Sequence, residues 1–113
     1  MTADLSALIA RLEAAEVGSR ELDYAIKAWL EPIDEFWALR VAADWTTSLD
    51  SAIALAERVV PGAEIWIGRI DGQWEADCEP VGCEKHSRFV DHKGRTPALA
   101  LCTAILRAKA QEG

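Results

Sequence analysis

Residues 64–79 read EIWIGRIDGQWEADCE, and this stretch decides the fold of the chain. Its pattern has the period of two that is typical of β-strands, on both sides of an Asp71-Gly72 pair. Asp-Gly is typical of a two-residue hairpin turn because both positions tolerate a positive φ. We therefore predict antiparallel strands over residues 64–70 and 73–79. They form a hairpin, or a three-stranded meander if residues 87–90 add a third short strand.

The two predicted strands distribute their apolar side chains differently. The first is apolar on both faces, since Ile65 and Ile67 point one way and Trp66 the other. The second alternates between apolar and polar residues, and we expect the polar side chains to lie in water. These polar residues are Gln73, Glu75, Asp77 and Glu79. We also expect Trp66 and Trp74 to face or flank each other across the hairpin.

Four other segments have apolar residues at the 3.6-residue period of a helix. They are residues 3–16, 20–30, 48–60 and 97–108. Their starts are marked by Ser19, Thr47 and Thr96, whose hydroxyl oxygens we expect to cap the second, third and fourth helix. Gly18 is expected to end the first helix in a left-handed conformation. The stretch between the second and third helices, residues 33–45, fits a short helix or an irregular loop equally well.

The predicted fold is therefore one α+β domain that spans residues 1–113. In it, an antiparallel hairpin or three-stranded meander packs with about four helices. The last helix is apolar around most of its circumference, which is typical of a helix buried from several sides. A chain of this length can bury roughly 65% of its unfolded surface, so it can hold a core without disulfides or metal.

Charge and composition exclude several classes of partner. The net charge is −7, which disfavours direct binding to nucleic acid or anionic lipid. No apolar run is long enough to span a membrane, and no basic-then-apolar leader opens the chain. The chain has three cysteines. An odd number of cysteines indicates free thiols in a reducing compartment. We therefore expect a cytoplasmic protein.

The sequence contains no pattern typical of a catalytic site. It has no Gly-x-Ser-x-Gly elbow, P-loop or dinucleotide-binding glycine series, and no cysteine at a predicted helix N-terminus. We therefore expect that the protein is not an enzyme and that it has neither catalytic residues nor a cofactor. One series has zinc-ligand residue types, but its spacing is wide for a structural zinc site and its first member lies on an apolar strand face. It consists of Cys78, Cys83, His86 and His92, and we predict no metal there.

An acidic row on the second strand is the first candidate binding surface. Glu75, Asp77 and Glu79 project from one face, about 6.6–7 Å apart. The simplest interpretation is a solvated outer face. The functional interpretation is a strip that meets a basic surface on a partner protein, and the spacing is too wide for the three carboxylates to converge on one metal ion.

A cationic segment before the last helix is the second candidate surface. Its basic residues lead into the N-terminus of that helix, where a phosphate or another anion is favoured. The alternative is a polar loop that balances nearby acids. The residues are Lys85, Arg88, Lys93 and Arg95.

The unpaired edge of the hairpin and the five tryptophans favour self-association, and we expect a homodimer.

Three segments at the helix starts resemble the phage ABA sandwich domain, a family of small phage and prophage proteins. They read GSRELD at residues 18–23, WTTSLDSAIAL at residues 45–55 with ERVVPG at 57–62, and TPALALC at residues 96–102. The resemblance covers most of the chain and implies an α/β/α layering, but no family-wide activity or ligand.

The resemblance, the acidity and the absence of catalytic patterns lead to one functional expectation. It is a phage accessory protein that binds a host protein stoichiometrically and inhibits a host defence system, in the manner of an anti-CRISPR protein. The alternative is a protein that binds an anionic, nucleotide-like small molecule in the cationic segment.

Overall fold

Four helices and three strands make up residues 5–30, 43–79 and 93–111, the part of the chain that the structure, a computed structural model, describes. The helices are α1 (Leu5–Ala14), α2 (Arg20–Leu30), α4 (Leu49–Val59) and α5 (Pro97–Gln111). The strands are β1 (Glu64–Ile70), β2 (Gln73–Glu79) and β3 (Lys93–Gly94). The predicted α+β class, with a short antiparallel sheet and about four helices, is confirmed.

The hairpin forms where the Asp71-Gly72 pair predicts it. Asp71 and Gly72 have φ values of 52° and 79°, so both central residues have the positive φ of a type I′ turn. The strands pair in the register that this turn imposes, from Ile70 opposite Gln73 to Glu64 opposite Glu79. The two-residue β3 pairs with the start of β2 and completes the order β1-β2-β3. The third strand predicted over residues 87–90 lies outside the described residues.

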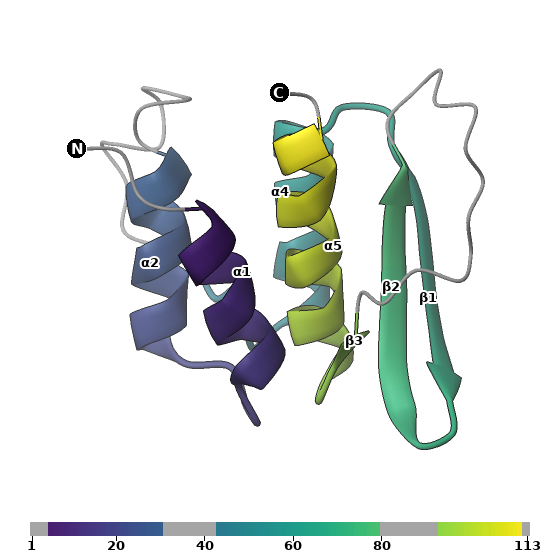
Figure 1. Cartoon of the computed structure of the whole chain (residues 1–113). Coiled ribbons are helices and arrows are strands. Elements are labelled where there is room, and N and C mark those ends of the chain that lie inside the picture. Colours follow the sequence, from purple (N-terminus) through teal and green to yellow (C-terminus); the bar gives the residue numbers. More distant parts are fainter. Residues whose placement is uncertain (1–4, 31–42, 80–92, 112–113) are drawn as a thin grey trace.

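Helix α5 is the centre of the molecule. It contacts β2, α1 and α4, and in Figure 1 it stands between α1 and the hairpin, in front of α4. Every residue from Ala98 to Leu106 is buried, which confirms the prediction of a helix covered from several sides. Among the described residues the helices lie on one side of the sheet, so the second helical layer that an α/β/α arrangement requires is not among them (Figure 1). None of the described helices is long and apolar enough to cross a membrane.

The sheet therefore has an inner face, against α5, and an outer face. Ala76 and Cys78 on the inner face are 1% and 3% exposed. Trp74 shares the inner face, opposite Arg69, whose guanidinium carbon lies 5.7 Å from the centre of the indole. Trp66 pairs with Asp77 and so lies on the outer face. The expectation that Trp66 and Trp74 face or flank each other is wrong, because cross-strand partners share a face and these two residues fall on opposite ones.

Hydroxyl caps begin the helices, with one change from the prediction. Ser19 and Thr96 accept the N–H groups of Leu22 and Leu99, at 3.2 Å each, as predicted. The cap of α4 is Ser48 and not Thr47. Ser48 has the extended backbone of a cap, with φ −125° and ψ 120°, and its side chain accepts the N–H of Ser51.

Gly18 has a different function from the one predicted. Helix α1 ends at Ala14, and Gly18 does not have a positive φ. A Cβ at Gly18 would instead overlap the carbonyl oxygen of Thr46. Glycine is needed here because two backbone segments pass too closely for any side chain.

A buried hydrogen-bond network holds these two segments together. Asp23 is 0% exposed, and its Oδ1 accepts the N–H of Thr46 at 2.9 Å and the hydroxyl of Thr46 at 2.8 Å. The same hydroxyl oxygen accepts the N–H of Ser19 at 3.0 Å. The first turn of α2 is thereby fixed against the turn that leads into α4.

The close approach at Gly18 gives the first prediction. We expect Gly18→Ala to lower the free energy of unfolding by about 3 kcal/mol, because the added methyl group separates Asp23 from Thr46. Gly72→Ala is the control, since a Cβ there meets nothing within 4 Å and costs only the strain of a positive φ, about 1 kcal/mol. Urea unfolding of both variants measures the difference. Equal losses would show that close packing at Gly18 is unimportant.

Candidate functional site

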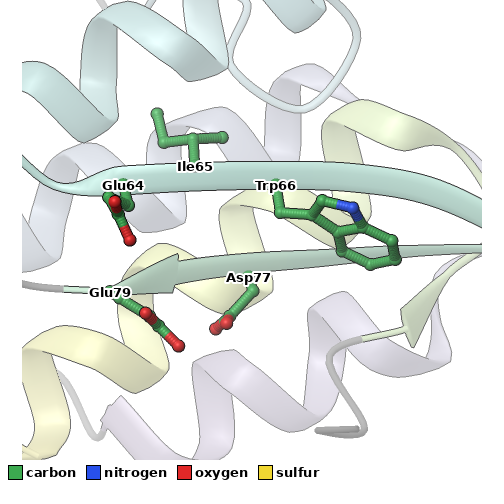
Figure 2. A pocket seen from close by; sticks show the side chains of 5 residues that line it. All are labelled: Glu64, Ile65, Trp66, Asp77 and Glu79. Atoms are coloured by element: carbon green, nitrogen blue, oxygen red, sulfur yellow. The ribbon is translucent and has the colours of Figure 1, made fainter. Parts of the chain in front are cut away.

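The outer face of the hairpin carries a hollow of about 230 Å³ lined mainly by acidic side chains and one tryptophan. The register places Glu64 opposite Glu79 and Trp66 opposite Asp77, so all of these residues share one face. Figure 2 shows the three carboxylates and the indole on the same side of the two strands, with Ile65 pointing the other way. The hollow therefore combines negative charge with an aromatic surface.

Trp66 lies along the outer face because its neighbour Gly68 has no side chain. A Cβ at Gly68 would be 2.6 Å from a carbon of the indole six-membered ring, so the ring occupies the space above this glycine. The indole is half-buried and sits between the acidic end of the hairpin and its turn. A flat apolar surface is thus held next to the carboxylates.

The acidic row is less exposed than predicted. Glu75 and Glu79 are half-buried and Asp77 is 8% exposed, so the expectation that Asp77 lies in water is wrong. Asp77 has the shortest side chain of the row and stands directly across from Trp66. Larger neighbours on the same face screen such a side chain from solvent. Asp77 is consequently the most buried acid of the hollow and forms its floor, Glu79 is half-buried, and Glu64 is exposed.

Glu64 is a site residue that the sequence analysis missed. In the sequence it is only the first residue of a predicted strand, but pairing outward from the two-residue turn puts it opposite Glu79. The cross-strand register set by the turn is therefore the sequence signal that identifies Glu64.

The cationic candidate site is only partly within the described residues. Lys85 and Arg88 lie outside them. Lys93 belongs to β3, where its backbone is opposite Glu75, and Arg95 is exposed just before the cap of α5. The structure does not bring these four residues together as a described site.

Of the four residues in the candidate zinc series, only the first lies among the described residues. Cys78 is buried on the inner face of the sheet, and Cys83, His86 and His92 lie outside the described residues. Within residues 5–30, 43–79 and 93–111, no three metal-binding side chains are grouped as a metal site.

A second hollow, of about 390 Å³, lies where α2, α4 and α5 begin. Two of the hydroxyls that line it already form hydrogen bonds inside the protein: Thr46 donates to Asp23, and Thr96 accepts the N–H of Leu99. These hydroxyls stabilise helix starts. The outer face of the sheet is the better candidate because its polar groups are charged side chains gathered on one surface.

Cys102 is buried in the core and is not poised as a nucleophile. Its thiol donates to the carbonyl oxygen of Trp45 at 3.3 Å. Burial, with a smaller effect from the charge of Asp23, raises the pKa of Cys102 to about 12. The thiol is therefore protonated at neutral pH, and a protonated thiol is a poor nucleophile.

Comparison of the chain with protein-family models, with curated proteins and with solved structures found no match.

The raised pKa of Cys102 gives a prediction about pH. A thiol that ionises near 9.0 when unfolded and near 12 when folded stabilises the fold below pH 9, and this contribution is lost as the pH rises from 9 toward 12. We expect the stability advantage of the native protein over Cys102→Ala to shrink by about 1 kcal/mol between about pH 8 and pH 10. Urea unfolding at both pH values tests this. An unchanged advantage would contradict it.

The burial of Asp77 gives a prediction that separates it from its neighbour. Asp77→Lys should lower the free energy of unfolding by about 2 kcal/mol or more, because a long cation then replaces a buried carboxylate. Glu64→Lys is the matched control, since Glu64 is exposed on the same face and its replacement should cost less than about 1 kcal/mol. Urea unfolding at neutral pH compares the two, and similar losses would contradict the assigned burial.

Proposed function

We propose that this protein acts by stoichiometric binding, and that the outer face of its hairpin contacts a basic surface on a partner protein. One observation carries the proposal. The carboxylates of Glu64, Asp77 and Glu79 gather beside a half-buried Trp66 on a sheet face that no described helix covers.

The chemistry of the hollow suits arginine and lysine side chains. Carboxylates accept charge-assisted hydrogen bonds from guanidinium and ammonium groups, which are stronger than neutral ones. The face of an indole attracts cations, arginine more often than lysine. In this arrangement Glu64 and Glu79 contact the partner directly, Trp66 supplies the flat apolar surface, and Asp77 shapes the floor.

The charge of the whole chain supports a basic partner. A net charge of −7 accelerates encounter with a positively charged surface and slows encounter with an acidic one. Such steering affects the association rate more than the final affinity, so the local hollow is still needed for specificity.

The wider role that we propose is that of a phage accessory protein in the host cytoplasm, which blocks a host defence protein by covering its basic surface. Its support is the resemblance of three helix-start segments to the phage ABA sandwich domain, together with the acidity and the absence of catalytic sequence patterns. In the structure those segments form helix caps and the Asp23–Thr46 network. They support the fold, and the binding face lies elsewhere, on the hairpin.

Binding of a fluorescent oligoarginine peptide, followed by anisotropy, tests the binding face. We expect the double variant Glu64→Gln with Glu79→Gln to bind about tenfold more weakly than the native protein, a loss of about 1.4 kcal/mol. The matched control is Glu16→Gln with Glu57→Gln, which removes the same charge from exposed positions on helix α4 and after α1. This control should bind almost like the native protein.

Two further comparisons sharpen the test. Trp66→Leu should reduce binding of oligoarginine more than binding of oligolysine, because the indole favours guanidinium groups. All complexes should weaken as salt rises above about 0.15 M. Equal weakening in the two double variants would mean that net charge alone attracts the peptide, and the proposed face would be refuted.

A further inference from the structure

Strand β1 is an edge of the described sheet, with β2 on one side and no described strand on the other. The two-residue turn makes Ile70 and Gln73 a hydrogen-bonded pair, and such pairs alternate along an antiparallel ladder. Residues 64, 66, 68 and 70 therefore direct their backbone groups toward β2. Ile65, Ile67 and Arg69 direct theirs away from the sheet, where a further strand can pair with them.

The side chains of β1 are covered less than those of β2. On the inner face, Ile65 and Ile67 are half-buried, whereas their cross-strand partners Cys78 and Ala76 are almost completely buried. At the turn end, Ile70 is 45% exposed. The helical layer thus covers the middle of the sheet better than its β1 side.

Within its own seven described residues, strand β1 lacks the sequence features that usually prevent pairing. Natural edge strands are commonly protected by proline, bulges or clustered lysines. Strand β1 has none of these: it is seven residues long, regular in register, and carries one acid and one base near opposite ends. Its charges cancel in a chain that is otherwise strongly acidic.

We propose that a second copy of this chain occupies this edge, with β1 paired antiparallel to β1 about a twofold axis at Ile67. In this register each of the seven residues of β1 stands opposite a residue of β1 in the partner copy. It also places the outward-pointing backbone groups opposite one another, Ile67 with Ile67 of the partner copy and Ile65 with Arg69 of the partner copy. A twofold axis through one of the other outward-pointing residues would shorten the overlap.

The same register fits the side chains of the outer face. Trp66 stands opposite Gly68 of the partner copy, so the two indoles lie side by side, each above its own glycine. Glu64 stands opposite Ile70 of the partner copy. The two Glu64 residues are then roughly 20 Å apart along the strands, at about 3.4 Å per residue. That separation exceeds the screening length of about 8 Å at physiological salt, so the acidic ends do not oppose pairing strongly.

The dimer extends the proposed binding face without depending on it. Two hollows then lie on one continuous sheet, with both tryptophans between them. A dimer forms whether or not a basic partner binds, so the two ideas can fail separately.

Sedimentation of Arg69→Pro and Arg69→Ala tests the interface. Proline removes an N–H that points away from β2, so it breaks no hydrogen bond of the hairpin, but it removes one interchain hydrogen bond from each copy. The native protein and Arg69→Ala should sediment at twice the chain mass of 12.4 kDa at micromolar concentration. We expect Arg69→Pro to dimerise at least about tenfold more weakly while keeping its circular dichroism spectrum.

Amide hydrogen exchange of the native protein provides a second measurement that needs no variant. The N–H groups of Ile65, Ile67 and Arg69 should exchange more slowly in concentrated than in dilute solution, because only the dimer protects them. Raising the salt should leave the dimer intact or strengthen it, whereas oligoarginine binding should weaken. A native protein that sediments at 12.4 kDa, or a dimer in which these three amides exchange freely, overturns the proposal.

Discussion

The buried contact between Asp23 and Thr46 is the constraint on which the rest of the structure depends. It joins residues 23 positions apart in the chain through a carboxylate oxygen that accepts both an N–H and a hydroxyl. Burying a carboxylate is costly unless it is hydrogen-bonded. The other oxygen of Asp23 accepts no hydrogen bond among the described residues, and the Arg20 guanidinium lies 3.5 Å from it and offsets part of its charge. The network is therefore stable only in one arrangement of α2 and the turn before α4.

That arrangement determines where α5 lies and, through α5, where the sheet lies. The carbonyl group of Trp45, next to Thr46, accepts the Cys102 thiol of α5. Helix α5 then covers the inner face of the hairpin, and the outer face remains uncovered by any described helix (Figure 1). The residues that build the fold and the residues that we assign to binding are thus separate sets, which allows the outer face to carry charges that a core would not accept.

Local signals predicted the fold well, and long-range contacts account for what they missed. The Asp71-Gly72 turn and the hydroxyls of Ser19 and Thr96 act within a few residues of the chain, so the sequence alone locates them. The need for glycine at position 18 comes from Thr46, which is distant in sequence. A helical pattern alone does not reveal such a neighbour.

The sequence predicted the chemical character of the candidate site, but not which residues form it. Alternation along β2 indicated an acidic outer face, and the burial of Asp77 depends on what stands across the hairpin. The register that follows from the turn would have placed Glu64 beside Glu79 and separated Trp66 from Trp74. The alternation within either strand does not contain this information, whereas a two-residue turn fixes every cross-strand pair at once.

Trp66 and Gly68 connect the two proposals physically. The indole lines the acidic hollow and lies above a glycine of the edge strand, so it takes part in both the binding face and the dimer contact. In the proposed dimer a second indole lies beside it, above the glycine of the partner copy. The ring already lies above Gly68 in the single chain, so neither a basic partner nor a second copy has to displace it. The hollow and the strand edge therefore share one side chain without competing for it, and this is why the binding face and the dimer contact can fail separately.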